Sequence, residues 1–172
     1  MSPSATPQEI AYQRTILQLL LAQNGSTTRL CETIAGGPID LHLISQRITE
    51  DVPQAVRRLL PGTRFIERFT SLAGHGEVMM DNLSYIALEG LAPDLRRGLE
   101  RGDVPIGHLL AQMWMRRVPL HAMRELLERL WRVVGLPDDG AARCHAVVTP
   151  DGPVMVLAEA FRRGMLQGAC VF

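Results

Sequence analysis

The sequence predicts an α+β fold in which helices cover an antiparallel sheet. Two pairs of strand-like segments are each joined by a tight turn rich in glycine or proline, and such short connections favour antiparallel pairing. Amphipathic helical segments precede each pair. With 47% apolar residues in 172, the chain is long enough for one well-filled core. We therefore expect a single domain over residues 1–172, with its core at about residues 8–163.

The first expected elements are two helices that meet at a polar hinge. From Gln8 to Gln23 the apolar residues fall broadly on one helical side, and Asn24-Gly25 suits a left-handed C-terminal cap. Ser26 or Thr27 can cap a second, short helix, which Gly36-Gly37 stops. A hinge of this kind exposes backbone N–H groups.

Strands follow the two helices. From Ile39 apolar and polar residues alternate, which is typical of a strand with one buried face, and a short helix is expected after Pro53. The segments Arg64–Leu72 and Glu77–Leu88 flank the turn Ala73–Gly76, whose glycines permit positive φ where the chain reverses. These two segments are predicted to form an antiparallel hairpin.

The second half of the chain again places helices before a hairpin. Helices are expected after Pro93, after Pro105 and over Met123–Gly135. Strands near Ala142–Val148 and Val154–Phe161 then flank a Pro-Asp-Gly-Pro turn. This hairpin completes the predicted sheet.

Glu159 is the most informative residue, because it lies in the middle of the apolar segment Val154–Phe161. Desolvating a bare carboxylate costs several kcal/mol unless the group is paired or protonated. We interpret Glu159 as a functional carboxylate. The alternative is a strand-end glutamate that just reaches solvent or binds a structural arginine.

Charge and hydropathy exclude several classes of partner. Eighteen basic residues balance eighteen acidic ones, and the arginine doublets are most simply solvated ends of elements, so no nucleic-acid partner is expected. No segment reaches the roughly 18 uninterrupted apolar residues of a membrane span, and the N-terminus lacks a secretory pattern. We therefore expect no membrane association and a cytoplasmic location. Three cysteines at unrelated spacings predict reduced thiols rather than disulfides.

Metal and dinucleotide sites are not expected either. The cysteines and histidines form no CxxC or HExxH spacing, and the adjacent Cys144 and His145 would point to opposite faces of a strand. Gly74-His75-Gly76 lacks the strand-to-helix setting of a dinucleotide loop. The segment Met113-Trp114-Met115 could line a lid, although core or helix-interface packing is the simpler interpretation.

Four segments together carry a resemblance to a known family. They are Leu19–Arg29, the strand Ile66–Phe69, Asp103–Gly107 and Pro153–Phe161. Their order and spacing, from about Leu17 to Phe161, resemble the chorismate lyase family, the chorismate–pyruvate lyases that release pyruvate from chorismate to leave a hydroxybenzoate. The mycobacterial branch looks closer than the short enterobacterial enzyme.

The resemblance implies specific site residues. Arg68 and Glu159 are implied as catalytic, and backbone N–H groups near Thr27 and at Ile106 and Gly107 are implied as donors to a ligand carboxylate. The residue types agree, because a guanidinium can hold a carboxylate through two parallel bonds and N–H groups at helix starts suit an anion. We therefore expect Arg68 and Glu159 to line one closed cavity.

These residues also have simpler interpretations. Arg68 could be a rim arginine paired with Glu67 or Glu77, and Thr27 and Ile106 could serve only as helix caps. Burial would raise the pKa of a glutamate such as Glu159, whereas a nearby arginine would lower it. The balance decides whether the group acts as a base or as a hydrogen-bond donor.

The resemblance further implies the ligand and the chemistry. The ligand is a small aromatic or cyclohexadiene carboxylic acid, no metal or organic cofactor is required, and the protein is a monomer or a weak homo-oligomer. The hinge near Gly25 and the segment after Pro105 are candidate flaps over the ligand. The alternatives are a lyase or cyclase-like enzyme of secondary metabolism acting on another substrate, and a non-catalytic protein that binds a small aromatic acid.

The chain departs from the family pattern at three positions. Leu83 stands where the enterobacterial-type enzyme has a second arginine, Phe69 follows Arg68, and Ala158 stands where relatives have a threonine. Because chorismate is a dicarboxylate, a missing cation at Leu83 would weaken or redirect binding unless His75, His145 or Arg143 replaces it.

Overall fold

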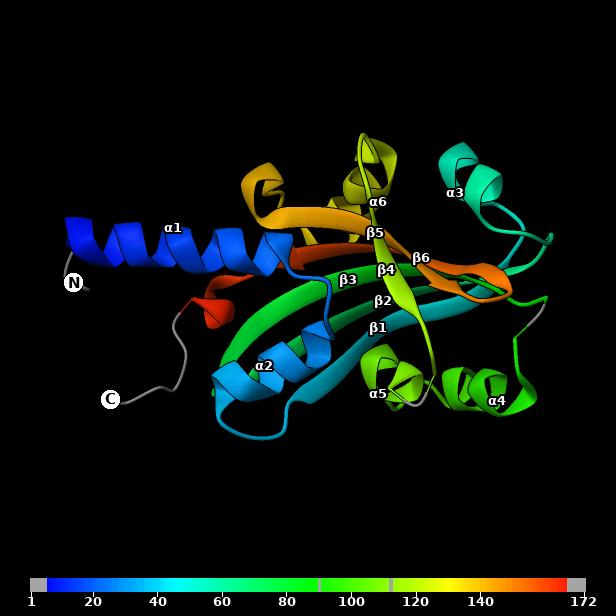
Figure 1. Ribbon diagram of the computed structural model, residues 1–172, viewed down its shortest axis with the longest axis horizontal. Coiled ribbons are helices and arrows are strands. Elements are labelled where there is room, and N and C mark those ends of the chain that lie inside the picture. Colours follow the sequence, from blue (N-terminus) through cyan, green and yellow to red (C-terminus); the bar gives the residue numbers. More distant parts are fainter. Residues whose placement is uncertain (1–5, 90, 112, 167–172) are drawn as a thin grey trace.

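The fold is that of a computed structural model, which describes residues 6–89, 91–111 and 113–166. In chain order the elements are α1 (Pro7–Ala22), α2 (Thr27–Ala35), β1 (Asp40–Thr49), α3 (Gln54–Leu59), β2 (Phe65–Gly74), β3 (Glu77–Ala87), α4 (Pro93–Arg101), α5 (Ile106–Leu110), β4 (Arg116–Leu120), α6 (Arg124–Val134), η1 (Asp139–Ala141), β5 (Ala142–Thr149), β6 (Gly152–Phe161) and η2 (Arg163–Met165). The strands form one six-stranded sheet in the order β1-β2-β3-β6-β5-β4 (Figure 1). Each neighbouring pair is antiparallel, so the predicted α+β class is confirmed.

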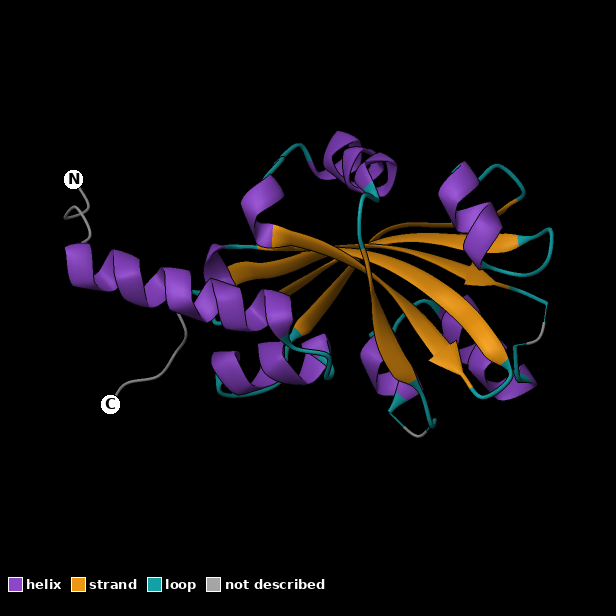
Figure 2. Ribbon diagram, turned by 45° about the horizontal axis from the view of Figure 1, so that its top comes forward, coloured by secondary structure: helices purple, strands orange, loops and turns teal. Residues whose placement is uncertain are grey.

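Helices lie on both sides of this strongly twisted sheet (Figure 2). The α6 face is the sheet face covered by α3 and α6, and the α5 face is the opposite one, covered by α2, α4 and α5. The α6 face is a continuous apolar core, which includes Val56, Phe65, Phe69, Leu83, Tyr85, Leu126, Leu130 and Val156. On the α5 face two apolar clusters lie toward opposite ends of the strands and leave polar side chains between them.

Local sequence signals explain where the first helices begin and where the first hairpin turns. Thr6 and Glu9 form a capping box at the start of α1, and the Ser26 hydroxyl accepts a hydrogen bond from the backbone N–H of Arg29 at the start of α2. His75 and Gly76 take positive φ values of 42° and 83° between β2 and β3. The predicted hairpins and helices are thus confirmed with shifts of one or two residues at their ends. The left-handed cap predicted at Asn24-Gly25 is wrong, because α1 ends at Gln23 in an extended conformation with φ −71° and ψ 148°.

Strand β1 differs from the prediction of a strand with one buried face. Leu43, Ile44 and Ile48 are 42–51% exposed. The physical reason is position, because β1 is an edge strand that pairs with β2 alone within the described residues. Alternation in the sequence therefore marked the strand correctly but not its burial.

Strand β4 was not predicted. It contains Pro119, which pairs with His145 of β5, and it begins with the arginine doublet that we interpreted as a solvated element end. Proline cannot donate to a ladder and is tolerated here because β4 forms the other edge of the sheet. Met113 and Met115 pack against an apolar cluster of the α5 face, so the interpretation of core packing holds for these two residues, whereas Trp114 is 68% exposed.

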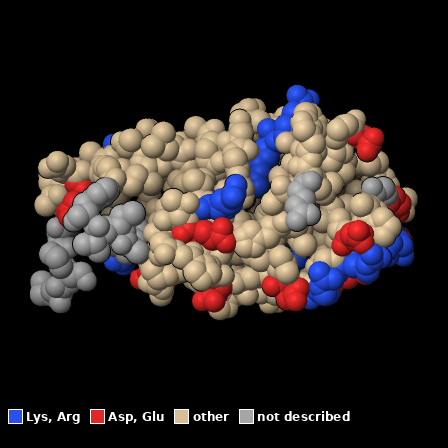
Figure 3. All heavy atoms as spheres, turned by 60° about the horizontal axis from the view of Figure 1, so that its bottom comes forward, with Lys and Arg blue, Asp and Glu red and all other residues tan. Residues whose placement is uncertain are grey.

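The surface on the side of α2, α4 and α5 carries charges of both signs (Figure 3). They gather at the end of this side where α4 pairs Arg96 with Glu100 and Arg97 with Asp94. Exposed pairs of this kind contribute little to stability. Among the helices described, none is long and apolar enough to cross a membrane.

The two-faced sheet makes a stability prediction for Leu83. Because Leu83 is fully buried in the α6-face core, Leu83→Ala should lower the free energy of unfolding by about 3 kcal/mol. The control Val133→Ala, at a 45% exposed position of α6, should change it by less than about 0.5 kcal/mol. Urea denaturation of both variants measures the difference, and a near-neutral Leu83→Ala would contradict the assignment of Leu83 to this core.

Candidate functional site

Glu159 lies near the end of β6 on the α5 face and is 2% exposed. Its Cα lies opposite Asn82 of β3 on one side and Arg143 of β5 on the other. Paired positions of an antiparallel sheet share a face, so the β5 neighbour is placed beside the carboxylate by register alone. The sequence prediction that this carboxylate is buried within a strand is confirmed.

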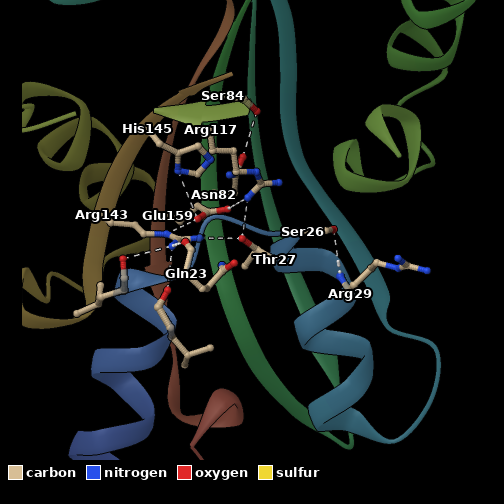
Figure 4. Close-up of polar contacts among 12 residues, drawn as sticks. Gln23, Ser26, Thr27, Arg29, Asn82, Ser84, Arg117, Arg143, His145 and Glu159 are labelled. Carbon is tan, nitrogen blue, oxygen red and sulfur yellow. Dashed lines mark hydrogen bonds and ion pairs between the residues drawn. The ribbon is translucent and has the colours of Figure 1, made fainter. Parts of the chain in front are cut away.

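Three basic side chains converge on the Glu159 carboxylate (Figure 4). Arg143 Nε lies 2.8 Å from Oε2, Arg117 Nη1 lies 3.8 Å from Oε1, and His145 Nδ1 lies 3.7 Å from Oε2. Arg143 and His145 come from β5 and Arg117 from β4, so the sheet edge that escaped prediction supplies one of the cations. All three side chains are at most 12% exposed.

The two arginines are anchored by the first two helices. Arg143 Nη1 donates to the carbonyl oxygen of Leu20 at 2.9 Å and also to that of Gln23, at the C-terminal end of α1 where carbonyls lack helical partners. Arg143 Nη2 and Arg117 Nη1 both donate to the Thr27 hydroxyl, at 3.1 and 3.0 Å. We call Glu159, Arg117, Arg143, His145 and Thr27 the Glu159 cluster.

Burial and charge set the ionisation of the cluster. Burial lowers the pKa of His145 to about 4, with the attraction of Glu159 opposing this and the two arginines adding to it, so the ring is neutral at pH 7. Burial alone would raise the pKa of Glu159, but the basic groups around it hold that pKa below its usual range. With two guanidinium ions and one carboxylate, the cluster carries one excess positive charge.

Thiol chemistry is disfavoured beside this cluster. Burial, together with the charge of Glu159, raises the pKa of both Cys31 and Cys144 to about 12. Neither thiol ionises at neutral pH, so neither is an activated nucleophile. Cys144 and His145 do face opposite sides of the sheet, as predicted. Across the described ranges, no three His, Cys, Asp or Glu side chains lie close enough to hold a metal ion.

A small cavity adjoins Glu159 on the α5 face. Its volume is about 30 Å³, room for roughly one or two water molecules. Its lining includes four of the five predicted site residues, namely Thr27, Ile106, Gly107 and Glu159. The fold thus places the starts of α2 and α5, where N–H donors were predicted, beside Glu159. Thr27 is not a helix cap, since Ser26 caps α2.

The helices α2 and α5 close this cavity by packing tightly against each other. A Cβ on Gly107 would lie 2.2 Å from Thr28 Oγ1 and 2.8 Å from its Cβ, so the close approach requires glycine. At the surface His108 Nε2 lies 2.8 Å from Glu32 Oε1 and joins the same two helices. These helices contain the segments predicted as candidate flaps, and they pack closely over the cavity.

Arg68 lies on the same sheet face as Glu159 but not in the lining of this cavity. It pairs with Ser84, and sheet spacing puts its Cα roughly 12 Å from that of Glu159. The side chain is fully buried, and Nη2 donates to the carbonyl oxygens of Gly102 and Val104, between α4 and α5. Glu159 lines this cavity and Arg68 does not, so the expectation that both residues line one closed cavity is wrong for this structure.

The guanidinium of Arg68 has spare donors. Its Nε and Nη1 are buried and have no hydrogen-bond partner among the described residues. Burial lowers its pKa, and the charge of Asp103 opposes this. The alternative of a rim arginine paired with Glu67 is wrong, because Glu67 points to the α6 face and binds Tyr85 and Arg47. A buried cation with free donors is suited to an anionic ligand.

The absence of a cation at Leu83 does not affect the site directly, because Leu83 points to the other face of the sheet. Leu83 packs in the α6-face core, and its neighbours Asn82 and Ser84 are the β3 residues that face the site. Cations instead come from Arg143 and Arg117, the latter missed because its strand and its burial were not predicted. His75 does not contribute, since its ring contacts the Gly164 carbonyl near η2.

The architecture and the Glu159 cluster define a class: a small α+β domain with a buried, net positive cluster and a cavity beneath a helical cover. Over 94% of its length the chain is 24% identical to proteins named chorismate pyruvate-lyase from Mycobacterium tuberculosis and Mycobacterium bovis, covering 87% of each. The similarity to this group is therefore nearly full-length. No protein-family model matches the chain.

Several solved structures show a weaker likeness to this chain. A ligand-binding domain assigned to a GntR-family transcriptional regulator of Bordetella bronchiseptica has a TM-score of 0.45 at 15% identity, covering 74% of this chain and 86% of that one. The C-terminal domain of the histidine utilization repressor of Pseudomonas syringae has a TM-score of 0.46 at 10% identity, covering 78% and 98%. Likeness at this level says nothing of what this chain binds.

The neutral, buried His145 predicts an acid-labile fold. The folded protein resists protonation of this ring between pH 6.5 and about 4, so stability is full above pH 6.5 and falls as the pH drops through that window. The loss should be on the order of 2 kcal/mol between pH 7 and 4.5. Urea unfolding of the wild type and of His145→Gln at each pH measures the free energy of unfolding. The variant should lack the loss of stability between pH 7 and 4.5. The exposed-site control His42→Gln should retain it.

The contact between α2 and α5 predicts the effect of a single methyl group. Gly107→Ala should force the two helices apart, because the added Cβ cannot fit beside Thr28. The substitution should destabilise the packing of α2 against α5 by about 1–3 kcal/mol. Hydrogen exchange followed by mass spectrometry should accelerate in residues 27–35 and 106–110. Gly37→Ala, where an added Cβ meets nothing within 4 Å, is the matched control. Unchanged exchange in Gly107→Ala would mean that the helices do not close the cavity.

Proposed function

We propose that this chain is a chorismate lyase-type enzyme that releases pyruvate from chorismate and leaves a hydroxybenzoate. One observation carries the proposal: an ionised, fully buried Glu159 adjoins a cavity whose wall also contains Thr27, Ile106 and Gly107. The nearly full-length similarity to proteins named chorismate pyruvate-lyase supports it. Buried ionised groups beside a cavity are frequent in catalytic sites.

The charge of the site supports a dicarboxylate substrate. The Glu159 cluster has one excess positive charge, and Arg68 adds a second with free donors some distance away on the same face. Chorismate carries two carboxylates, one on the ring and one on the enolpyruvyl group. In the proposal Arg68 and the N–H groups of α2 and α5 bind the ring carboxylate, and Arg117 and Arg143 attract the second.

Glu159 acts on the ring in this proposal. Its carboxylate accepts a hydrogen bond from the ring hydroxyl and takes the proton from the carbon that bears this hydroxyl. The electron pair of that C–H bond enters the ring, the C–O bond to the enolpyruvyl group breaks, and the released enolpyruvate takes up a proton to become pyruvate. The ring becomes aromatic, which drives the reaction, so the protein contributes mainly orientation.

The cavity volume requires movement during the cycle. A space of about 30 Å³ cannot hold a ring with two carboxylates, so α2 and α5 must separate before substrate enters. When they close again, they exclude water and place their first N–H groups over the ligand. In the proposal this closure gives the two helices the role of flaps.

The proposal predicts that Glu159→Gln loses activity and keeps the fold. Purified protein is incubated with chorismate, and pyruvate is followed by coupled reduction to lactate. The variant should release pyruvate about 10²–10⁴ times more slowly, because the amide cannot accept the developing proton. Glu67→Gln is the matched control, a buried glutamate bonded to Tyr85 and Arg129 on the α6 face, and it should keep near-normal turnover.

Full activity in Glu159→Gln would refute the assigned role. A second candidate function, a protein that binds a small aromatic acid without turnover, is favoured by the low pKa of Glu159, which makes the carboxylate a weak base. Stoichiometric binding of chorismate with no pyruvate would support that candidate. Inertness toward chorismate in both binding and turnover would favour a lyase or cyclase-like enzyme with a different substrate.

A further inference from the structure

A second, larger hollow lies on the other side of the two arginines from the Glu159 cavity. Its volume is about 310 Å³, and it lies between the C-terminal end of α1, the end of β4 and the start of α6. We call it the outer chamber. Strand β4 ends at Leu120, opposite Cys144, so Ala142 and Arg143 of β5 extend past it and form the chamber wall.

The outer chamber is accessible without movement of the flaps. Asn24 and His121, which line it, are both exposed. Neither α2 nor α5 contributes a lining residue, whereas both line the small cavity. Arg117 lines both spaces and therefore separates them. A ligand in the outer chamber would contact the cluster through Arg117, Arg143 and His145, because Glu159 does not line this space.

One end of the outer chamber is polar and positively charged. Its lining includes Arg117, Arg143 and His145, which belong to a cluster with one excess positive charge. Gln23 Nε2, in a further lining side chain, is a buried donor that has no hydrogen-bond partner among the described residues. Buried donors without partners cost free energy, which an acceptor group from a ligand would recover.

The other end is apolar. Leu120, Met123, Leu127 and Ala142 line it, and no acidic side chain is part of the chamber wall within the described residues. A volume of about 310 Å³ lies at the lower end of the range for small-molecule sites. One carboxylate attached to one ring matches both the size and the division into a polar and an apolar end.

We propose that the outer chamber binds a small aromatic monocarboxylate, with its carboxylate toward Arg117, Arg143 and the Gln23 amide and its ring among Leu120, Met123 and Leu127. This site is separate from the Glu159 cavity. Ligand binding in the outer chamber does not require turnover at Glu159. The proposal of this second site therefore holds even if the chain does not act on chorismate. An occupant would place a second negative charge next to the arginines that hold Glu159, so occupation of the two sites would be coupled.

Two methionines allow each space to be observed separately. Met123 lines the outer chamber and Met80 lines the Glu159 cavity. The full chain is labelled with ¹³C at the methionine methyl groups, both signals are assigned through Met→Leu variants, and sodium benzoate is titrated as the probe. The Met123 signal should shift with its own saturation midpoint, and a separate midpoint or no shift is expected at Met80.

Two variants locate the binding. Leu127→Trp should fill the chamber and abolish the Met123 shift, whereas Val133→Trp, on the exposed side of the same helix, should leave it unchanged. Gln23→Leu removes one free donor from the half-buried end of α1 and should weaken benzoate binding about tenfold. An altered Met80 signal in the absence of benzoate would reveal that Leu127→Trp does not fold. In that case Gln23→Leu is the variant that tests the proposal.

The neutral analogue benzamide tests the role of charge. It should bind at least about tenfold more weakly than benzoate, because it lacks the anion. A Met123 signal that does not move at about 10 mM benzoate would overturn the proposal. Equal shifts with benzamide, or shifts of Met80 alone, would overturn it too, the latter because they would place the ligand in the Glu159 cavity.

Discussion

The ion pair between Arg143 and Glu159 is the contact on which the rest of the site depends. Both groups are almost completely buried, and each would cost several kcal/mol of desolvation without the other. The same guanidinium binds the carbonyl oxygens at the end of α1 and the hydroxyl of Thr27. Loss of the pair would therefore loosen two helices as well as the carboxylate. The arginine fixes the hinge between α1 and α2 to the centre of the sheet.

The two faces of the sheet have different roles. Its α6 face is an apolar core in which Leu83 and Leu130 contribute packing, and its α5 face holds charged groups between two apolar clusters. A surplus of buried positive charge on one face is costly in the absence of a ligand. We infer that anion binding recovers this cost, both in the Glu159 cavity and in the outer chamber. The two spaces share Arg117 as a wall, whereas Arg143 lines only the outer chamber.

Much of the architecture could be predicted because its signals are local. Tight turns between apolar segments predicted both hairpins, and capping residues with periodic apolar positions predicted the helices. Glu159 was recognisable because a charged residue interrupts an apolar strand. Strand β4 was not, because Pro119 and two arginines obscure a short edge strand, and Arg117 was therefore assigned to the surface. The resemblance placed Leu83 where a relative has a second arginine, but the side chain lies in the core of the α6 face, and sequence similarity alone does not show which face of a strand a side chain occupies.

The sequence by itself determined the class of fold, the existence of a buried carboxylate and the backbone segments that meet near it. Only the tertiary structure decided which cations hold that carboxylate, because strand order and register are set by pairing between residues far apart in the chain. Arg143 lies beside Glu159 through the β5–β6 register, and Arg117 reaches it from a strand at the sheet edge. Periodicity within a strand reveals which residues share a face, but not which strands lie side by side.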